Sequence, residues 1–99
     1  MAFKIKVEPE ALDDIQQSID WYNEKQAGLG RKFLAEVKSC FKSLKVNPFF
    51  QVRYDEVRCL PLKKFPFMIH FTVHEADKVV VIRAVFNTYL YPDKWENRK

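Results

Sequence analysis

The sequence predicts an α+β domain with the element order β-α-α-β-β-β, in which an αα-hairpin packs on one face of a twisted antiparallel sheet. Two observations carry this prediction. The first half of the chain repeats apolar residues every three or four positions, whereas the second half alternates apolar and polar residues. With 99 residues, of which 47% are hydrophobic, the chain has room for one core, so we expect a single domain over residues 1–99.

The first strand and both helices are predicted within residues 3–46. Phe3, Ile5 and Val7 alternate with charged residues, which is typical of a half-buried strand. Pro9 follows at a position that the first turn of a helix tolerates. The apolar stripe of the first helix runs to Lys25 and that of the second starts at Leu29: Ala11, Leu12, Ile15, Ile19 and Tyr22, then Leu29, Phe33, Val37, Cys40, Phe41 and Leu44.

The connection between these helices contains both glycines of the chain, Gly28 and Gly30. They flank a single leucine, so a tight turn and an antiparallel hairpin are predicted. Asn47-Pro48 ends the second helix, because the residue before proline is pushed out of the α region.

Three strands are predicted in the second half. Residues 57–62 form a strand that Pro61 places at a sheet edge or on a bulge. Residues 67–74 alternate most regularly. Residues 79–86 are apolar on both faces, which indicates a central strand covered on both sides. Its expected faces are Val80, Ile82, Ala84 and Phe86 on one side, and Val79, Val81 and Val85 on the other. The helices cover one face, so the other requires the segment around Trp95 or another chain.

Several classes of protein are excluded. No stretch approaches the roughly 18 apolar residues of a membrane span, and charges interrupt the N-terminus, so we expect a cytoplasmic protein. No phosphate loop, nucleophile elbow or metal-ligand spacing occurs, so no cofactor and no metal are predicted. Cys40 and Cys59 are expected as free buried thiols. His70 and His74 are expected to be exposed on one strand face, about 13 Å apart.

Positive charge is concentrated in the second part of the chain. Residues 1–30 hold three basic and six acidic residues, and residues 31–99 hold fourteen basic and seven acidic residues. This asymmetry favours nucleic acid or an acidic protein segment as a partner. The candidate cations are interleaved with aromatic residues that suit a stacked base or an amphipathic peptide: Arg53, Arg58, Lys63, Lys64 and Arg83, with Phe65, His70, Tyr89 and Tyr91.

Four stretches together resemble the RelE/ParE superfamily, the toxins of bacterial type II toxin–antitoxin pairs, which are often described as plasmid stabilisation proteins. These stretches are PEALDDIQQSIDWYNEKQAGLGRKFLAEV, NPF, VRCLPLKKFPFMIHFTV and VVVIRAVFNTYLYPDKW. The resemblance covers Phe3 to Trp95. It implies a compact toxin that a small acidic antitoxin neutralises. RelE-like members cut messenger RNA in the ribosomal A site, and ParE-like members poison DNA gyrase.

Two features place the chain closer to the ParE side. The helical hairpin, from Pro9 to Val46, is long. Asn87 stands where such sequences commonly carry His, and Tyr89 or Leu90 stands where they carry Arg. Because Asn cannot accept and return a proton near neutral pH, it cannot replace His as a general base.

Three functional hypotheses follow. The first is a ParE-like toxin that binds a large target such as DNA gyrase. The second is a RelE-like endoribonuclease that acts on messenger RNA at the ribosome, and the third is a decayed toxin that keeps only antitoxin binding. The candidates for catalysis are Arg58, Lys63, Lys64, Arg83, Asn87, Tyr89 and Tyr91. The candidates for binding the antitoxin or target are Arg53, Arg58, Lys64, Arg83, Tyr91 and Trp95.

Overall fold

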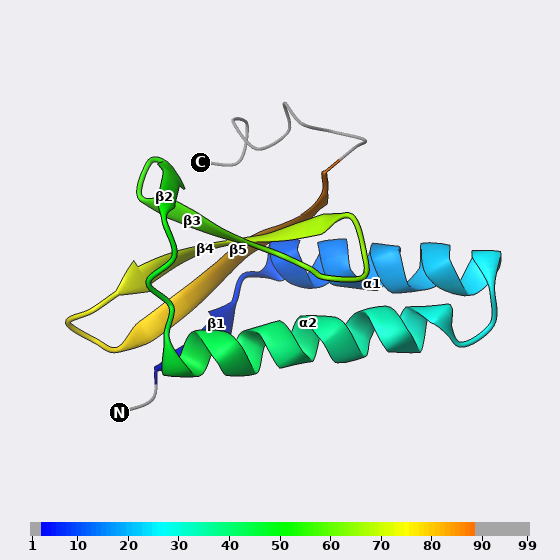
Figure 1. The fold of residues 1–99 in the computed structure, drawn as a ribbon, viewed down its shortest axis with the longest axis horizontal. Coiled ribbons are helices and arrows are strands. Elements are labelled where there is room, and N and C mark those ends of the chain that lie inside the picture. Colours follow the sequence, from blue (N-terminus) through cyan, green and yellow to red (C-terminus); the bar gives the residue numbers. More distant parts are fainter. Residues whose placement is uncertain (1–2, 89–99) are drawn as a thin grey trace.

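The computed structural model describes residues 3–88 of the chain. Its elements are β1 (Lys4–Val7), α1 (Pro9–Lys25), α2 (Leu29–Val46), β2 (Val52–Tyr54), β3 (Val57–Pro61), β4 (Phe67–His74) and β5 (Val79–Asn87). The two helices lie side by side on one face of the sheet (Figure 1). The predicted α+β fold and helical hairpin are confirmed. The short strand β2 was not predicted.

The five strands form one sheet in the order β1-β5-β4-β3-β2. Neighbouring strands from β3 to β5 run antiparallel, as predicted, and β2 also pairs antiparallel with β3. β1 instead pairs in parallel with β5, from Lys4 opposite Val79 to Val7 opposite Ile82, so the sheet is mixed. β5 therefore lies between two strands, in agreement with its apolar pattern on both faces.

β3 is an inner strand rather than an edge, because β2 pairs with its first two residues. Val52 lies opposite Arg58, and Tyr54 lies opposite Val57. Pro61 is the last residue of β3, beyond the part that β2 pairs with. A proline there removes no bond from the β2–β3 ladder, so the sheet tolerates it.

A β-bulge in β5 changes which side chains face the helices. Phe71 lies opposite Ile82 and His70 opposite Ala84, which leaves Arg83 as the extra residue. Val80, Ile82 and Val85 consequently belong to the core beneath the helices, which Ala84 and Phe86 do not join. The prediction that Ala84 and Phe86 share a face with Ile82 was wrong, because a count by twos does not allow for the inserted residue.

The core lies between the hairpin and the sheet. Phe33 of α2 is fully buried and packs against three aromatic rings. Its ring centroid is 5.5 Å from Tyr22, 5.3 Å from Phe65 and 4.9 Å from Phe67. α1 contributes Ala11, Ile15 and Tyr22 from the predicted stripe, whereas Leu12 is 55% exposed.

The two glycines serve different purposes in the hairpin. Gly28 has φ of 87°, in the left-handed region that favours glycine. Gly30 allows a close approach of the helices, because a Cβ atom there would lie 2.5 Å from the carbonyl oxygen of Ile19. Its N–H donates to Oδ1 of Asn23 at 2.9 Å. The start of α2 is thereby fixed against the end of α1.

Candidate functional site

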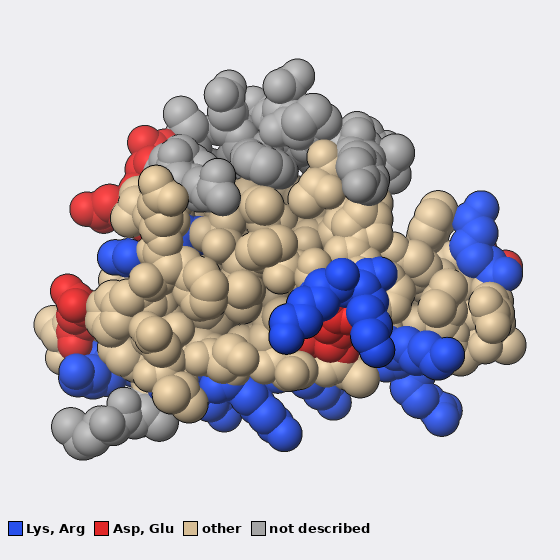
Figure 2. All heavy atoms as spheres, in the orientation of Figure 1, with Lys and Arg blue, Asp and Glu red and all other residues tan. Residues whose placement is uncertain are grey.

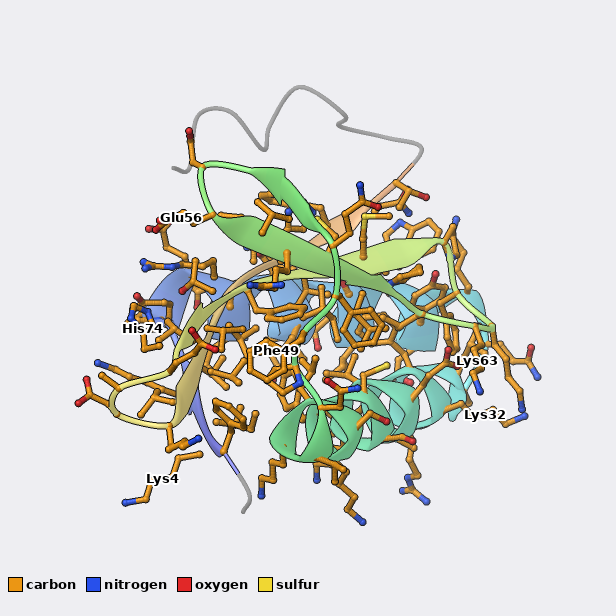
Figure 3. All side chains as sticks on the ribbon, turned by 60° about the vertical axis from the view of Figure 1, so that its left-hand side comes forward. Lys4, Lys32, Phe49, Glu56, Lys63 and His74 are labelled. Carbon is orange, nitrogen blue, oxygen red and sulfur yellow. The ribbon has the colours of Figure 1, made fainter. Side chains whose placement is uncertain are left out.

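The cations proposed from the sequence do not gather on one surface. Arg58 extends on the helix side of the sheet, and Lys63 and Lys64 lie in the β3–β4 loop next to α2. Arg83 lies with Glu8, which follows β1, and with Thr72 of β4. Figure 3 shows Lys63 and His74 at opposite sides of the molecule. Arg53 lies in β2, and Tyr89, Tyr91 and Trp95 lie outside the described residues.

Arg58 is held by the segment that follows α2. It shares a sheet face with Leu60, which packs against the core. Its Nη1 donates to the carbonyl oxygen of Phe50 at 2.5 Å, and its guanidinium lies 5.7 Å from the ring centroid of Phe49. Both contacts fix the link between α2 and β2. Arg58 therefore fastens this link to the sheet.

Lys63 and Lys64 are positioned by a single carboxylate. Their backbone N–H groups both donate to Oε1 of Glu36 in α2, the second at 2.8 Å. The two side chains are exposed. Glu36 thus fastens the β3–β4 loop to α2, and the two ammonium groups are displayed beside the helix (Figure 3, Lys63).

A chain of polar side chains crosses the outer face of the sheet, the face turned away from the helices. Nη1 of Arg83 donates to Oε1 of Glu8 at 3.2 Å, and its Nε donates to Oγ1 of Thr72 at 3.4 Å. Oγ1 of Thr72 lies 3.1 Å from Nε2 of His74. We call Glu8, Arg83, Thr72 and His74 the outer-face polar cluster. Only Arg83 of this cluster was a candidate from the sequence, because its partners come from β4 and from the residue that follows β1, both distant from β5 in the sequence.

His70 lies on the same face but is buried, so the prediction that it is exposed was wrong. Its ring centroid is 5.3 Å from that of Phe86, and Sγ of Cys59 lies 3.5 Å from its Nδ1. Burial lowers the pKa of His70 to about 4, and the negative charge of Asp14 raises it by a smaller amount. His70 is therefore neutral near pH 7.

The remaining candidates are close to strand ends or helices. Asn87 is the last residue of β5 and lies opposite Phe67. Cys59 is buried as expected, whereas Cys40 is only partly buried, and the two cysteines form no disulfide. Burial raises the pKa of the Cys40 thiol, with a further contribution from the charge of Glu36. The Cys40 thiol is thereby not activated as a nucleophile near neutral pH.

Residues 3–88 contain neither a cluster of metal ligands nor a membrane-spanning helix. No group of three or more His, Cys, Asp or Glu side chains is arranged to hold a metal ion. No helix in this part of the chain is long and apolar enough to cross a membrane.

Comparison with known proteins identifies a family. Residues 5–88 match the model of the ParE toxin of type II toxin–antitoxin systems, parDE. No curated protein matches the sequence.

Solved structures of toxin–antitoxin systems share the fold. The chromosomal ParDE system of Pseudomonas aeruginosa aligns with a TM-score of 0.75 and 21% identity, over 87% of this chain and 96% of that chain. The toxin–antitoxin complex RelBE2 of Mycobacterium tuberculosis aligns with a TM-score of 0.63 and 14% identity, over 88% and 99%. The archaeal RelE–RelB complex of Pyrococcus horikoshii aligns with a TM-score of 0.53 and 16% identity, over 91% and 99%.

Proposed function

Because the chain belongs to the family of ParE toxins of type II toxin–antitoxin systems, we propose that it acts by binding a large cellular target, with DNA gyrase as the first candidate. The observation that carries this proposal is the family match, which covers residues 5–88. The end of β5 adds support, since Asn87 cannot exchange a proton near neutral pH as a histidine does.

The burial of His70 also favours binding over RNA cleavage. A general base needs an accessible nitrogen and a pKa near the working pH. His70 has neither, because it is buried and its pKa is about 4. His74 is exposed, but its Nε2 lies at 3.1 Å from the hydroxyl oxygen of Thr72.

The test is a supercoiling assay with purified DNA gyrase. We expect the purified protein to inhibit supercoiling at micromolar concentration. An equimolar amount of cognate antitoxin, added as the control, is expected to restore the activity. Full supercoiling at saturating toxin would contradict gyrase as the target.

We propose a small acidic antitoxin as the partner, and we place its contact at the β2 edge of the sheet. Val52 of β2 is a large apolar residue that is 45% exposed at this edge. Among the strands of residues 3–88, β2 pairs only with β3, so we propose that its other side accepts an added strand. Lys63 and Lys64, which Glu36 displays beside α2, are cations that acidic antitoxin residues can contact.

Co-purification with the product of the adjacent open reading frame tests this contact. Val52→Asp places a charge on the proposed interface and is expected to weaken binding at least tenfold, equivalent to about 1.4 kcal/mol. Leu12→Asp is the matched control, because Leu12 is exposed on α1, far along the chain from β2. Equal loss of binding in both variants would place the contact elsewhere.

One observation favours the RelE-like alternative. The outer-face polar cluster combines an arginine with an accessible histidine, groups that can stabilise charge and move a proton. Toeprinting of translated messages distinguishes this activity from binding alone. Cleavage that is lost in His74→Gln would establish the ribonuclease. If neither gyrase inhibition nor cleavage is found and expression leaves growth unimpaired, the chain is a decayed toxin that keeps antitoxin binding.

A further inference from the structure

The solvent-facing side of α2 carries a row of cations. Arg31, Lys38, Lys42 and Lys45 are all exposed, and their spacing of seven, four and three residues keeps them on one side of the helix. At 1.5 Å per residue the row is about 21 Å long. Figure 2 shows Lys and Arg side chains along the lower edge of the molecule, where Figure 1 places α2. We call these four residues the α2 basic row.

The row is free of negative charge within α2. Glu36 is the only acidic residue of this helix, and it faces the β3–β4 loop, where it accepts the N–H groups of Lys63 and Lys64. None of the four cations of the row takes part in an ion pair with another described residue. Their charge is therefore available to a ligand.

The side chains around the α2 basic row indicate which kind of anionic ligand it suits. Ala35 and Ser39, which are exposed near the row, are small, so a ligand backbone can approach the helix. Leu34 and Phe41 beside the row are packed against the core, so the row offers no exposed aromatic ring for a stacked base. Val46, which is 79% exposed, is an apolar side chain that a peptide could use, but it lies at the C-terminal end of α2, beyond the last cation of the row. Along the rest of its length the row presents cations alone, which matches a regular line of phosphates.

We propose that the α2 basic row binds the phosphate backbone of double-stranded nucleic acid, independently of base sequence. A length of about 21 Å corresponds to about six base pairs at 3.4 Å each. Flexible lysines and one arginine contact phosphates without reading bases. The proposal does not depend on gyrase as the target, since it concerns a helix face outside the sheet.

α1 limits where the duplex lies. Its carboxylates Asp13 and Glu24 are exposed, and the helix runs beside α2. These carboxylates repel phosphates, which keeps the duplex along α2. Their removal is consequently expected to strengthen binding.

The experiment measures the affinity for fluorescent DNA and RNA duplexes of 20 base pairs as salt is varied. Four phosphate contacts predict a slope of log K against log salt of about −3.6, or a loss of roughly 100-fold between about 50 and 200 mM salt. The two duplexes identify which nucleic acid supplies the phosphates. Polyglutamate is the competitor that represents an acidic protein.

The matched variants have the same net charge. Lys38→Gln, Lys42→Gln and Lys45→Gln combined are expected to reduce the slope by about three units, and each single change by about one. Lys4→Gln, Lys6→Gln and Lys25→Gln combined remove three exposed lysines from β1 and α1 and are expected to leave the slope unchanged.

The double variant Asp13→Asn, Glu24→Gln removes two negative charges from α1. We expect it to bind the duplex more tightly, the opposite of the effect expected for the α2 lysine variants. The proposal is overturned if the two lysine triple variants lose equal affinity, because net charge alone then accounts for binding. It is also overturned if the duplex does not bind, or if polyglutamate competes as well as DNA at equal charge. Each of these results is independent of the supercoiling assay, so the two proposals can fail separately.

Discussion

Oδ2 of Asp14 in α1 accepts the backbone N–H of Val85 in β5 at 3.1 Å. The register of β1 along β5 ends at Ile82, and the bulge at Arg83 follows, so the N–H of Val85 lies beyond the β1 ladder. The carboxylate supplies an acceptor for this group. The helix that covers the sheet thus also completes its hydrogen bonding where β1 stops.

Removal of this acceptor is expected to destabilise the fold. Asp14→Ala leaves the N–H of Val85 without its carboxylate and should lower the free energy of unfolding by about 1–3 kcal/mol. Asp14→Asn keeps an acceptor oxygen and should lower it less. Urea denaturation measures both, with Asp13→Ala at an exposed position as the control. An Asp14→Ala variant as stable as the control would show that water replaces the carboxylate.

Substitution of Gly30 tests the helix contact. In Gly30→Ala the new Cβ atom meets the carbonyl oxygen of Ile19 at 2.5 Å, and a backbone atom cannot rotate away. The helices must separate, so we expect a loss of about 1–3 kcal/mol in the free energy of unfolding. Gly28→Ala is the comparison, because nothing lies within 4 Å of its Cβ position and its cost, about 1–2 kcal/mol, comes from the positive φ alone.

Crystallography or NMR of the Gly30→Ala variant separates the two causes. We expect the α1–α2 distance to increase there and to be unchanged in Gly28→Ala. Unchanged helix separation in Gly30→Ala would contradict the close-contact explanation.

Local patterns in the sequence predicted most of the fold, and the misses share one physical cause. The stripes of both helices and the two-sided pattern of residues 79–86 are properties of neighbouring residues, so they can be read directly. The bulge at Arg83, the three-residue strand β2 and the burial of His70 depend on pairing with distant segments. No local period encodes such pairing.

The candidate site shows the same division. Arg83 was identified from its type, but its carboxylate partner Glu8 is 75 residues away in the sequence. Arg58 was proposed for a binding surface, whereas the structure places its guanidinium on the carbonyl oxygen of Phe50. The sequence therefore showed which residues carry positive charge, but not which face of the folded protein each of them occupies.

His70 makes stability depend on pH. Its pKa is about 4 in the folded protein and about 6.5 in the unfolded chain, so the unfolded chain takes up the proton first as pH falls. The free energy of unfolding should therefore decrease between about pH 6.5 and pH 4, by about 3 kcal/mol in total. Above about pH 7 both states are neutral at this side chain, and it contributes no pH dependence.

Urea denaturation between pH 4.5 and 7.5 checks this dependence. We expect His70→Gln to flatten the profile, because the substituted side chain does not titrate. His74→Gln is the control at an exposed position of the same strand and should keep the profile. The same slope in His70→Gln as in the unchanged protein would assign the dependence to other groups.

Glu36 is expected to control the motion of the β3–β4 loop. Glu36→Ala removes the acceptor of both the Lys63 and the Lys64 N–H groups. Because a hydrogen bond to a charged acceptor contributes about 1.5 kcal/mol or more, hydrogen exchange at these amides should accelerate at least about tenfold. Glu24→Ala on α1 is the control and should leave both exchange rates unchanged.

Arg58 is expected to act as a structural anchor rather than as part of a working surface. Arg58→Ala removes the hydrogen bond to the carbonyl oxygen of Phe50 and the contact with the Phe49 ring, so we expect the free energy of unfolding to fall by about 1–3 kcal/mol. Arg31→Ala, at an exposed site, should change it by less than about 0.5 kcal/mol. The second measurement is target inhibition per folded molecule, which should be unchanged in Arg58→Ala. An Arg58→Ala protein that unfolds at the same urea concentration as the unchanged protein, yet no longer inhibits its target, would place Arg58 on the working surface instead.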